Sequence, residues 1–210
     1  MLFNKNFVLL LMVWGLVISS GCSTTAPKKV EDKKPVKTAQ IASINDVEYK
    51  RLSDEAQQNY KLALGAMKNN QYSVAEQLLV PVEKEYPDFL NTLVNLGIIY
   101  FKTGRIPQAE GTFKKVVEID ENNVIAYNYL GILYRQENRF EEAKNAYEQA
   151  LKIDPNYAYA HLNLGILYDI YLGDPSKALS NYQRFQELTT KEDKEVKKWI
   201  VDLQRRQNTN

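Results

Sequence analysis

The amino-acid sequence predicts an all-α protein, a solenoid of about four helix pairs followed by a C-terminal capping helix. Three observations predict this fold class. The segment LGILY occurs at residues 130–134 and 164–168, and LGIIY occurs at 96–100, so each copy follows the last by 34 residues. Each interval contains two helical stretches separated by a polar turn. One helix pair cannot bury its apolar face alone, so a repeat of this length is typical of stacked pairs.

The composition is that of a folded protein and argues against several classes of function. Hydrophobic residues make up 44% of the chain and charged residues 25%. The formal net charge is +1, and no basic block with interleaved aromatic residues suggests nucleic-acid binding. One Cys and one His argue against a zinc site, a disulfide framework or a thiol–imidazole pair. We therefore expect a protein without catalytic activity, metal or cofactor.

The N-terminus has the pattern of an export signal. Phe7–Ile18 is an apolar run of 12 residues, too short to cross a membrane as a helix but suited to a signal peptide. Small residues then precede the only cysteine, Cys22. This resembles a bacterial lipoprotein signal over 1–21, which implies lipidation of Cys22, although Ser19 replaces the usual branched aliphatic residue. The alternative is an anchoring helix with a buried free thiol.

The resemblance to lipoproteins also implies a location. An Asp directly after the lipidated cysteine marks inner-membrane retention in many Gram-negative bacteria, and this chain has Ser23 there. We therefore expect an outer-membrane lipid anchor facing the periplasm. Residues 22–50 are rich in Pro, Lys, Thr and Ser and are expected to form a flexible linker, in which Ile41 and Ile44 are the only aliphatic pair.

The repeat domain is expected over 51–189. Its units are placed near 56–89, 90–123, 124–157 and 158–189. In the third unit the helices are predicted at Val124–Gln136 and Phe140–Ile153, and Pro155 ends the second helix because the residue before it disfavours the α conformation. Pro107 suits the first turn of a second helix, and Asp174 is expected to cap another.

These units resemble tetratricopeptide repeats. The residues of the third unit that carry the resemblance are Tyr127, Leu130, Gly131, Tyr134, Ala143, Tyr147, Ala150 and Pro155. The second and fourth units keep part of this signature, and the first has Ala63 in place of the glycine. The fourth unit has one extra residue, with ten steps from Tyr168 to Ala178 against nine in the third unit. The resemblance implies a right-handed superhelix with a concave groove that binds proteins.

The last segment, 190–207, is expected to form the capping helix. Thr190–Asp193 resembles a capping box. Apolar residues then follow at i, i+3, i+4 and i+7, on one helical face: Val196, Trp199, Ile200 and Leu203. This face is expected to cover the last repeat. The alternative is a partner-binding helix with Trp199 as an exposed anchor.

Beside the stacking face, each first helix has a second, largely apolar face, which lines the groove in this family. Two such faces exceed the single stripe that a core needs, so this surface requires a partner or a cover. The expected peptide groove comprises Val94, Asn95, Ile98, Phe101, Asn128, Ile132, Arg135, Leu162, Asn163 and Ile166. The alternative is that these rows pack on one another or on Ile41 and Ile44.

The combined resemblances imply an outer-membrane lipoprotein that acts as a protein-interaction scaffold. Its plan is similar to that of type IV pilus biogenesis lipoproteins, which promote secretin assembly but usually have more repeats. The partner is expected to be a periplasmic or outer-membrane protein of an envelope machine, of the pilus and secretin kind or of the TonB kind. The alternative function is a regulator that recruits peptidoglycan synthases or hydrolases.

Overall fold

The computed structural model describes residues 46–208, all within one compact unit. Its helices are α1 (Asp46–Tyr49), α2 (Asp54–Lys68), α3 (Tyr72–Glu85), α4 (Leu90–Lys102), α5 (Ile106–Ile119), α6 (Val124–Gln136), α7 (Phe140–Ile153), α8 (Ala158–Leu167), the π-helical turn η1 (Tyr168–Leu172), α9 (Pro175–Leu188) and α10 (Lys194–Asn208). None of the helices in this range is long and apolar enough to cross a membrane. Cys22 and the predicted signal peptide lie outside the described residues.

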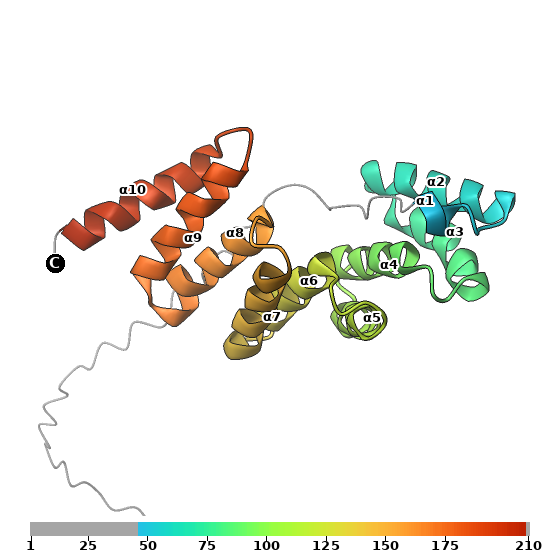
Figure 1. Cartoon of the computed structure of the whole chain (residues 1–210), viewed down its shortest axis with the longest axis horizontal. Coiled ribbons are helices and arrows are strands. Elements are labelled where there is room, and N and C mark those ends of the chain that lie inside the picture. The colour runs from blue at the N-terminus through green and yellow to red at the C-terminus, as the bar shows by residue number, and fades with distance from the viewer. Residues whose placement is uncertain (1–45, 209–210) are drawn as a thin grey trace, which may run out of the picture. The chain divides into compact units, whose positions relative to one another are not determined.

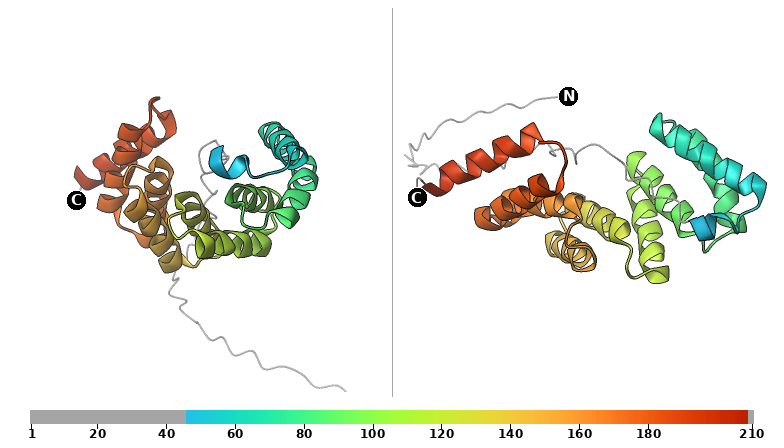
Figure 2. Two further views of the ribbon diagram at one scale, coloured as in Figure 1. Left: turned by 45° about the vertical axis from the view of Figure 1, so that its right-hand side comes forward. Right: turned by 45° about the horizontal axis from the view of Figure 1, so that its top comes forward.

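Eight of these helices form four pairs. The first helices α2, α4, α6 and α8 pack on the second helices α3, α5, α7 and α9, and each second helix also contacts the next first helix (Figure 1). α10 packs on α9, and Figure 2 shows the array from two further directions. The predicted all-α fold of helix pairs is confirmed. The helix bounds predicted for the third pair also agree with α6 and α7.

The glycine of each LG segment allows the two helices of a pair to approach closely. A Cβ atom on Gly131 would collide with the ring of Tyr147, and the glycines of the second and fourth pairs face an aromatic ring in the same way. The first pair instead has Ala63 and Leu79 at the matching positions, and both side chains are fully buried. The smaller leucine therefore leaves room for the alanine methyl group.

Salt bridges on the outer side connect successive pairs in register. Arg105 contacts Glu76 of the preceding pair with an N···O distance of 2.5 Å, and Arg139 contacts Glu110 in the same way at 3.2 Å. Each guanidinium group also lies over a tyrosine ring of its own pair, at 4.5 and 4.1 Å from the ring centroid. The 34-residue period therefore repeats polar contacts as well as the core.

The fourth pair accommodates its extra residue in η1, a π-helical turn that follows α8. Hydrogen bonds in a π-helix join residues five apart, so the turn takes one more residue than an α-helical turn. Gly173 ends η1 with φ +67°, in the left-handed region that favours glycine. Asp174 then caps α9 by accepting a hydrogen bond from the backbone N–H of Lys177 over 3.0 Å, as predicted.

The start of α10 differs from the expected one. The helix begins at Lys194, four residues after the predicted Thr190. The side chain of Asp193 accepts hydrogen bonds from the backbone N–H groups of Glu195 and Val196, over 2.9 and 3.2 Å. The predicted capping box at Thr190 is therefore wrong, because the carboxylate itself caps the helix.

The short helix α1 lies within the range assigned to the linker. The hydroxyl of Tyr49 donates to the backbone carbonyl of Gln57 over 3.2 Å, and its ring centroid lies 6.1 Å from that of Tyr60. One aromatic residue docks this polar segment on the first pair. Composition shows that the segment is polar but cannot show which surface its single ring meets.

Candidate functional site

The predicted groove residues form columns along the first helices. On α6, Asn128, Ile132 and Arg135 are spaced i, i+4 and i+7 and therefore share one helical face. The matching columns are Val94, Ile98 and Phe101 on α4 and Leu162, Ile166 and Asp169 on α8 and η1. Because the first helices follow one another at a constant step, the columns have the same register on each of them.

Within residues 46–208, nine of the ten predicted groove residues are buried and one, Phe101, is half-buried. The buried members are Val94, Asn95, Ile98, Asn128, Ile132, Arg135, Leu162, Asn163 and Ile166. The apolar members belong to the core that runs through the helix pairs. The residues are thus brought together as predicted by their spacing, but in the interior of the domain. Their part in peptide binding stays a prediction.

Hydrogen bonds link neighbouring first helices across these columns. The side-chain nitrogen of Asn163 donates to Oδ1 of Asn128 over 2.9 Å, and that of Asn95 donates to the hydroxyl of Tyr60 over 3.0 Å. Burial raises the pKa of Tyr60, and the hydrogen bond from Asn95 offsets only part of the increase. The tyrosine hydroxyl therefore stays neutral and serves as a fixed acceptor for the amide.

Some buried polar atoms of this face have no hydrogen-bond partner among the described residues. They include Oδ1 of Asn95, Oδ1 of Asn163 and all three guanidinium nitrogens of Arg135. A buried oxygen without a donor costs about 1–3 kcal/mol, and an uncompensated buried cation costs more. Native proteins contain few such atoms. These positions are therefore where an additional hydrogen-bonding group would stabilise the protein most.

A second polar cluster lies where α6, η1, α9 and α10 meet. Asp169 accepts a hydrogen bond from Nη2 of Arg206 at 3.0 Å and another from the hydroxyl of Tyr182 at 3.3 Å. Burial and the Asp169 carboxylate raise the pKa of Tyr182, and the charges of Arg135 and Arg206 partly oppose this increase. Both guanidinium groups therefore lie close enough to act on the same hydroxyl.

The sequence analysis did not assign Asp169, Tyr182 or Arg206 to a site. The available signal was the extra residue before Ala178, because it marks where the fourth pair departs from the repeat. The position of Arg206 depends on the return of α10 across the last pair, which no local pattern in the sequence shows.

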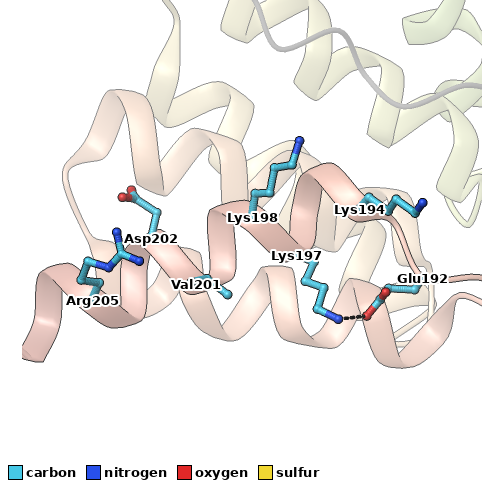
Figure 3. A pocket seen from close by; sticks show the side chains of 7 residues that line it. All are labelled: Glu192, Lys194, Lys197, Lys198, Val201, Asp202 and Arg205. Carbon is cyan, nitrogen blue, oxygen red and sulfur yellow. Dashed lines mark ion pairs between the residues drawn. The ribbon is translucent and has the colours of Figure 1, made fainter.

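Two depressions lie away from the columns. One, of about 530 Å³, follows the outer face of α10 (Figure 3) and is lined by Glu192, Lys194, Lys197, Lys198, Val201, Asp202 and Arg205. The other, of about 380 Å³, lies between α3, α4 and α5, and Leu93, Leu96 and the salt-bridged pair Lys115 and Glu83 are among its lining residues. Within the described range, no cluster of three or more His, Cys, Asp or Glu residues could hold a metal ion.

Comparisons with known proteins agree with the repeat architecture. Family models described as tetratricopeptide repeat match residues 88–156 and 146–180. No curated protein matches the chain significantly. The solved structure of PilF from Pseudomonas aeruginosa is 18% identical, with a TM-score of 0.66 over 74% of this chain and 70% of that one. MamA from Desulfovibrio magneticus RS-1 is also 18% identical, with a TM-score of 0.62 over 74% of this chain and 87% of that one.

A third similar structure contains a bound peptide. It is the first tetratricopeptide repeat domain of Spaghetti (RPAP3) bound to an HSP90 peptide, 20% identical, with a TM-score of 0.52 over 57% of this chain and 93% of that one. At these identities the structures establish a shared fold. Since the two family matches together span 88–180 and the described helices pair in the same repeat, this chain is a tetratricopeptide repeat protein, of a scaffold family that is typically non-enzymatic.

Proposed function

We propose that the chain is a lipid-anchored scaffold of the bacterial outer membrane, and that its first helices hold a segment of a periplasmic or outer-membrane protein. The observation that carries the binding role is the pair of acceptor oxygens on Asn95 and Asn163. Both amide nitrogens donate within the domain, and both oxygens have no donor among residues 46–208. An extended peptide presents backbone N–H groups that would satisfy these oxygens.

Because the face is buried, a partner has to displace the side chains that cover it. Phe101 is the predicted member that reaches solvent, and its ring packs edge-on against Tyr129 with centroids 5.6 Å apart. It lies one turn beyond Ile98, so its rotation would open the column on α4. The peptide complex of the Spaghetti domain supports this use of the fold.

The location and the assembly rest on sequence and on fold similarity. The apolar run before Cys22, and Ser23 after it, favour an outer-membrane lipoprotein. The shared fold with PilF favours a pilus- or secretin-type machine, and a TonB-type system remains the second member of the same class. In either case the repeat domain would position one protein component for assembly.

Site-specific crosslinking in intact cells tests the binding role. A photo-reactive residue at position 101 should give a discrete adduct that contains a periplasmic or outer-membrane protein. The matched control is position 152, where Lys152 is exposed on the second helix α7. Equal adducts at both positions, or none at position 101, would refute binding at this face.

Metabolic labelling tests the anchor separately. A fatty-acid analogue should label the wild-type chain and not the Cys22→Ala variant, and only the wild-type chain should fractionate with the outer membrane. Absence of label on the wild-type chain would exclude the lipid anchor and leave the binding role intact.

A further inference from the structure

α10 covers the last helix pair with a narrow apolar face. Val196 and Leu203 are fully buried, and the ring of Trp199 lies 5.4 Å from that of Tyr182 on α9. The opposite face is charged (Figure 3), with Lys194, Lys197, Lys198, Asp202 and Arg205 around Val201. α10 is therefore an amphipathic helix whose outer face is hydrated while its inner face is docked.

The C-terminal part of α10 is held by Arg206. Its guanidinium group binds Asp169 at 3.0 Å, and it also contacts Asp202 of its own helix at 3.1 Å. The side chain of Asp169 is 8% exposed, whereas those of Arg206 and Asp202 are 51% and 62% exposed. The ion pair to Asp169 is thus the contact by which the end of α10 reaches the interior.

Arg135 provides a second cation at this junction. It is 2% exposed, and none of its guanidinium nitrogens donates a hydrogen bond to a described residue. Its charge acts on the hydroxyl of Tyr182, the same hydroxyl that donates to Asp169. While Arg206 holds the carboxylate, a buried guanidinium beside it lacks a hydrogen-bonded anion. Such an arrangement destabilises the state that contains it.

We propose that α10 is an exchangeable cap, and that the end of the stack beneath it is a docking surface for an amphipathic helix of the same chemistry. That partner helix has apolar residues at i, i+3, i+4 and i+7 and a cation at i+10, which are the positions of Val196, Trp199, Ile200, Leu203 and Arg206 in α10. When Arg206 leaves, the carboxylate of Asp169 pairs with Arg135. The released state therefore gains an ion pair that the docked state lacks.

The probe is a fluorescent synthetic peptide of residues 191–208, KEDKEVKKWIVDLQRRQN, added to the full chain. Fluorescence anisotropy should show saturable binding, and the same peptide with Leu203→Asp should not bind. The Arg206→Ala chain holds its own α10 less firmly, so it should bind the wild-type peptide roughly fivefold more tightly. Arg205→Ala, on the outer face of the same helix, is the matched control and should leave the affinity unchanged.

Arg135→Met tests the buried cation. Methionine keeps an unbranched side chain and removes the charge, so α10 should stay docked for longer. We expect slower binding of the peptide with the same final anisotropy, because the own helix and the peptide dock on the same altered surface. The midpoint of thermal unfolding should rise.

Three results would overturn the proposal. The first is absence of peptide binding to both the wild-type and Arg206→Ala chains. The second is equal affinity of the Arg206→Ala and Arg205→Ala chains for the peptide. The third is a lower unfolding midpoint with faster peptide exchange in Arg135→Met, since this would show that Arg135 already pairs with a carboxylate in the docked state.

Discussion

The two ends of the helix stack are closed by different means. At the N-terminal end, α2 has Asn59, Gly65 and Ala66 where α6 has Tyr127, Leu133 and Tyr134. Leu62 is the exception, and it is 53% exposed while Leu130 at the same repeat position is 4% exposed. At the C-terminal end the last pair keeps an apolar surface, and α10 covers it. One end is therefore closed by the composition of its own repeat, and the other by a separate helix.

The largest effect that tests this comparison is expected for one substitution at the same repeat position in two pairs. Leu130→Ala removes a buried side chain from between two pairs and should lower the free energy of unfolding by about 2–5 kcal/mol. Leu62→Ala, on the exposed end, should change it by about 0.5 kcal/mol or less. Urea unfolding followed by circular dichroism measures both. Similar losses would mean that Leu62 is covered in solution and that the two ends do not differ.

The contact between the helices of a pair should show a smaller effect. Gly131→Ala adds a methyl group against Tyr147 and should destabilise by about 1–3 kcal/mol. The double variant with Tyr147→Leu recreates the Ala63–Leu79 arrangement of the first pair. Its loss should be at least about 1 kcal/mol smaller than the sum of the two single losses.

Gly65→Ala provides the control for Gly131, since a Cβ atom there meets nothing within 4 Å. Helix propensity should then stabilise the chain by about 0.5–1 kcal/mol. Additive losses for Gly131→Ala and Tyr147→Leu would show that ring size does not decide which residue faces it.

The smallest effect is expected for the salt bridges between pairs. Burial of Glu110 opposes its charged form, but hydrogen bonds from Lys114 and Arg139 outweigh this and lower its pKa. Because the folded pKa lies below the unfolded value, the stabilisation is present above about pH 4.3 and is lost as pH falls through the folded pKa.

Glu110→Gln should therefore be less stable than the wild type at pH 7 by about 0.5–1 kcal/mol, and the difference should vanish towards pH 3. High salt should reduce the difference at pH 7. A difference that is independent of pH would mean that Glu110 contributes through packing and not through its charge.

The repeat architecture could be predicted from sequence because its determinants recur. LG segments at a constant spacing, Pro155 after α7 and Asp174 before α9 are local signals, and the bounds of α6 and α7 followed from them. The columns on the first helices were also predicted, since residues at i, i+4 and i+7 share a face whatever surrounds them.

The environment of those columns could not be predicted in the same way. Periodicity assigns Ile98 and Ile132 to a face but does not show what covers that face, and both are buried. Arg135 was expected to give the groove its polarity, and it lies instead beside Tyr182 and the ion pair between Asp169 and Arg206. That cluster depends on η1 and α10, the two elements of the C-terminal end that do not follow the repeat.

The π-helical turn η1 also limits how the array can grow. Repeat proteins lengthen when a unit is duplicated and its copy stacks on an unchanged neighbour. Beyond α9 this is unfavourable, because Asp169 and Tyr182 present a carboxylate and a hydroxyl to the arginine of α10. The second and third units end in surfaces that fit another unit of 34 residues. This array can therefore gain length by duplication of its interior units, and its last unit acts as a terminator.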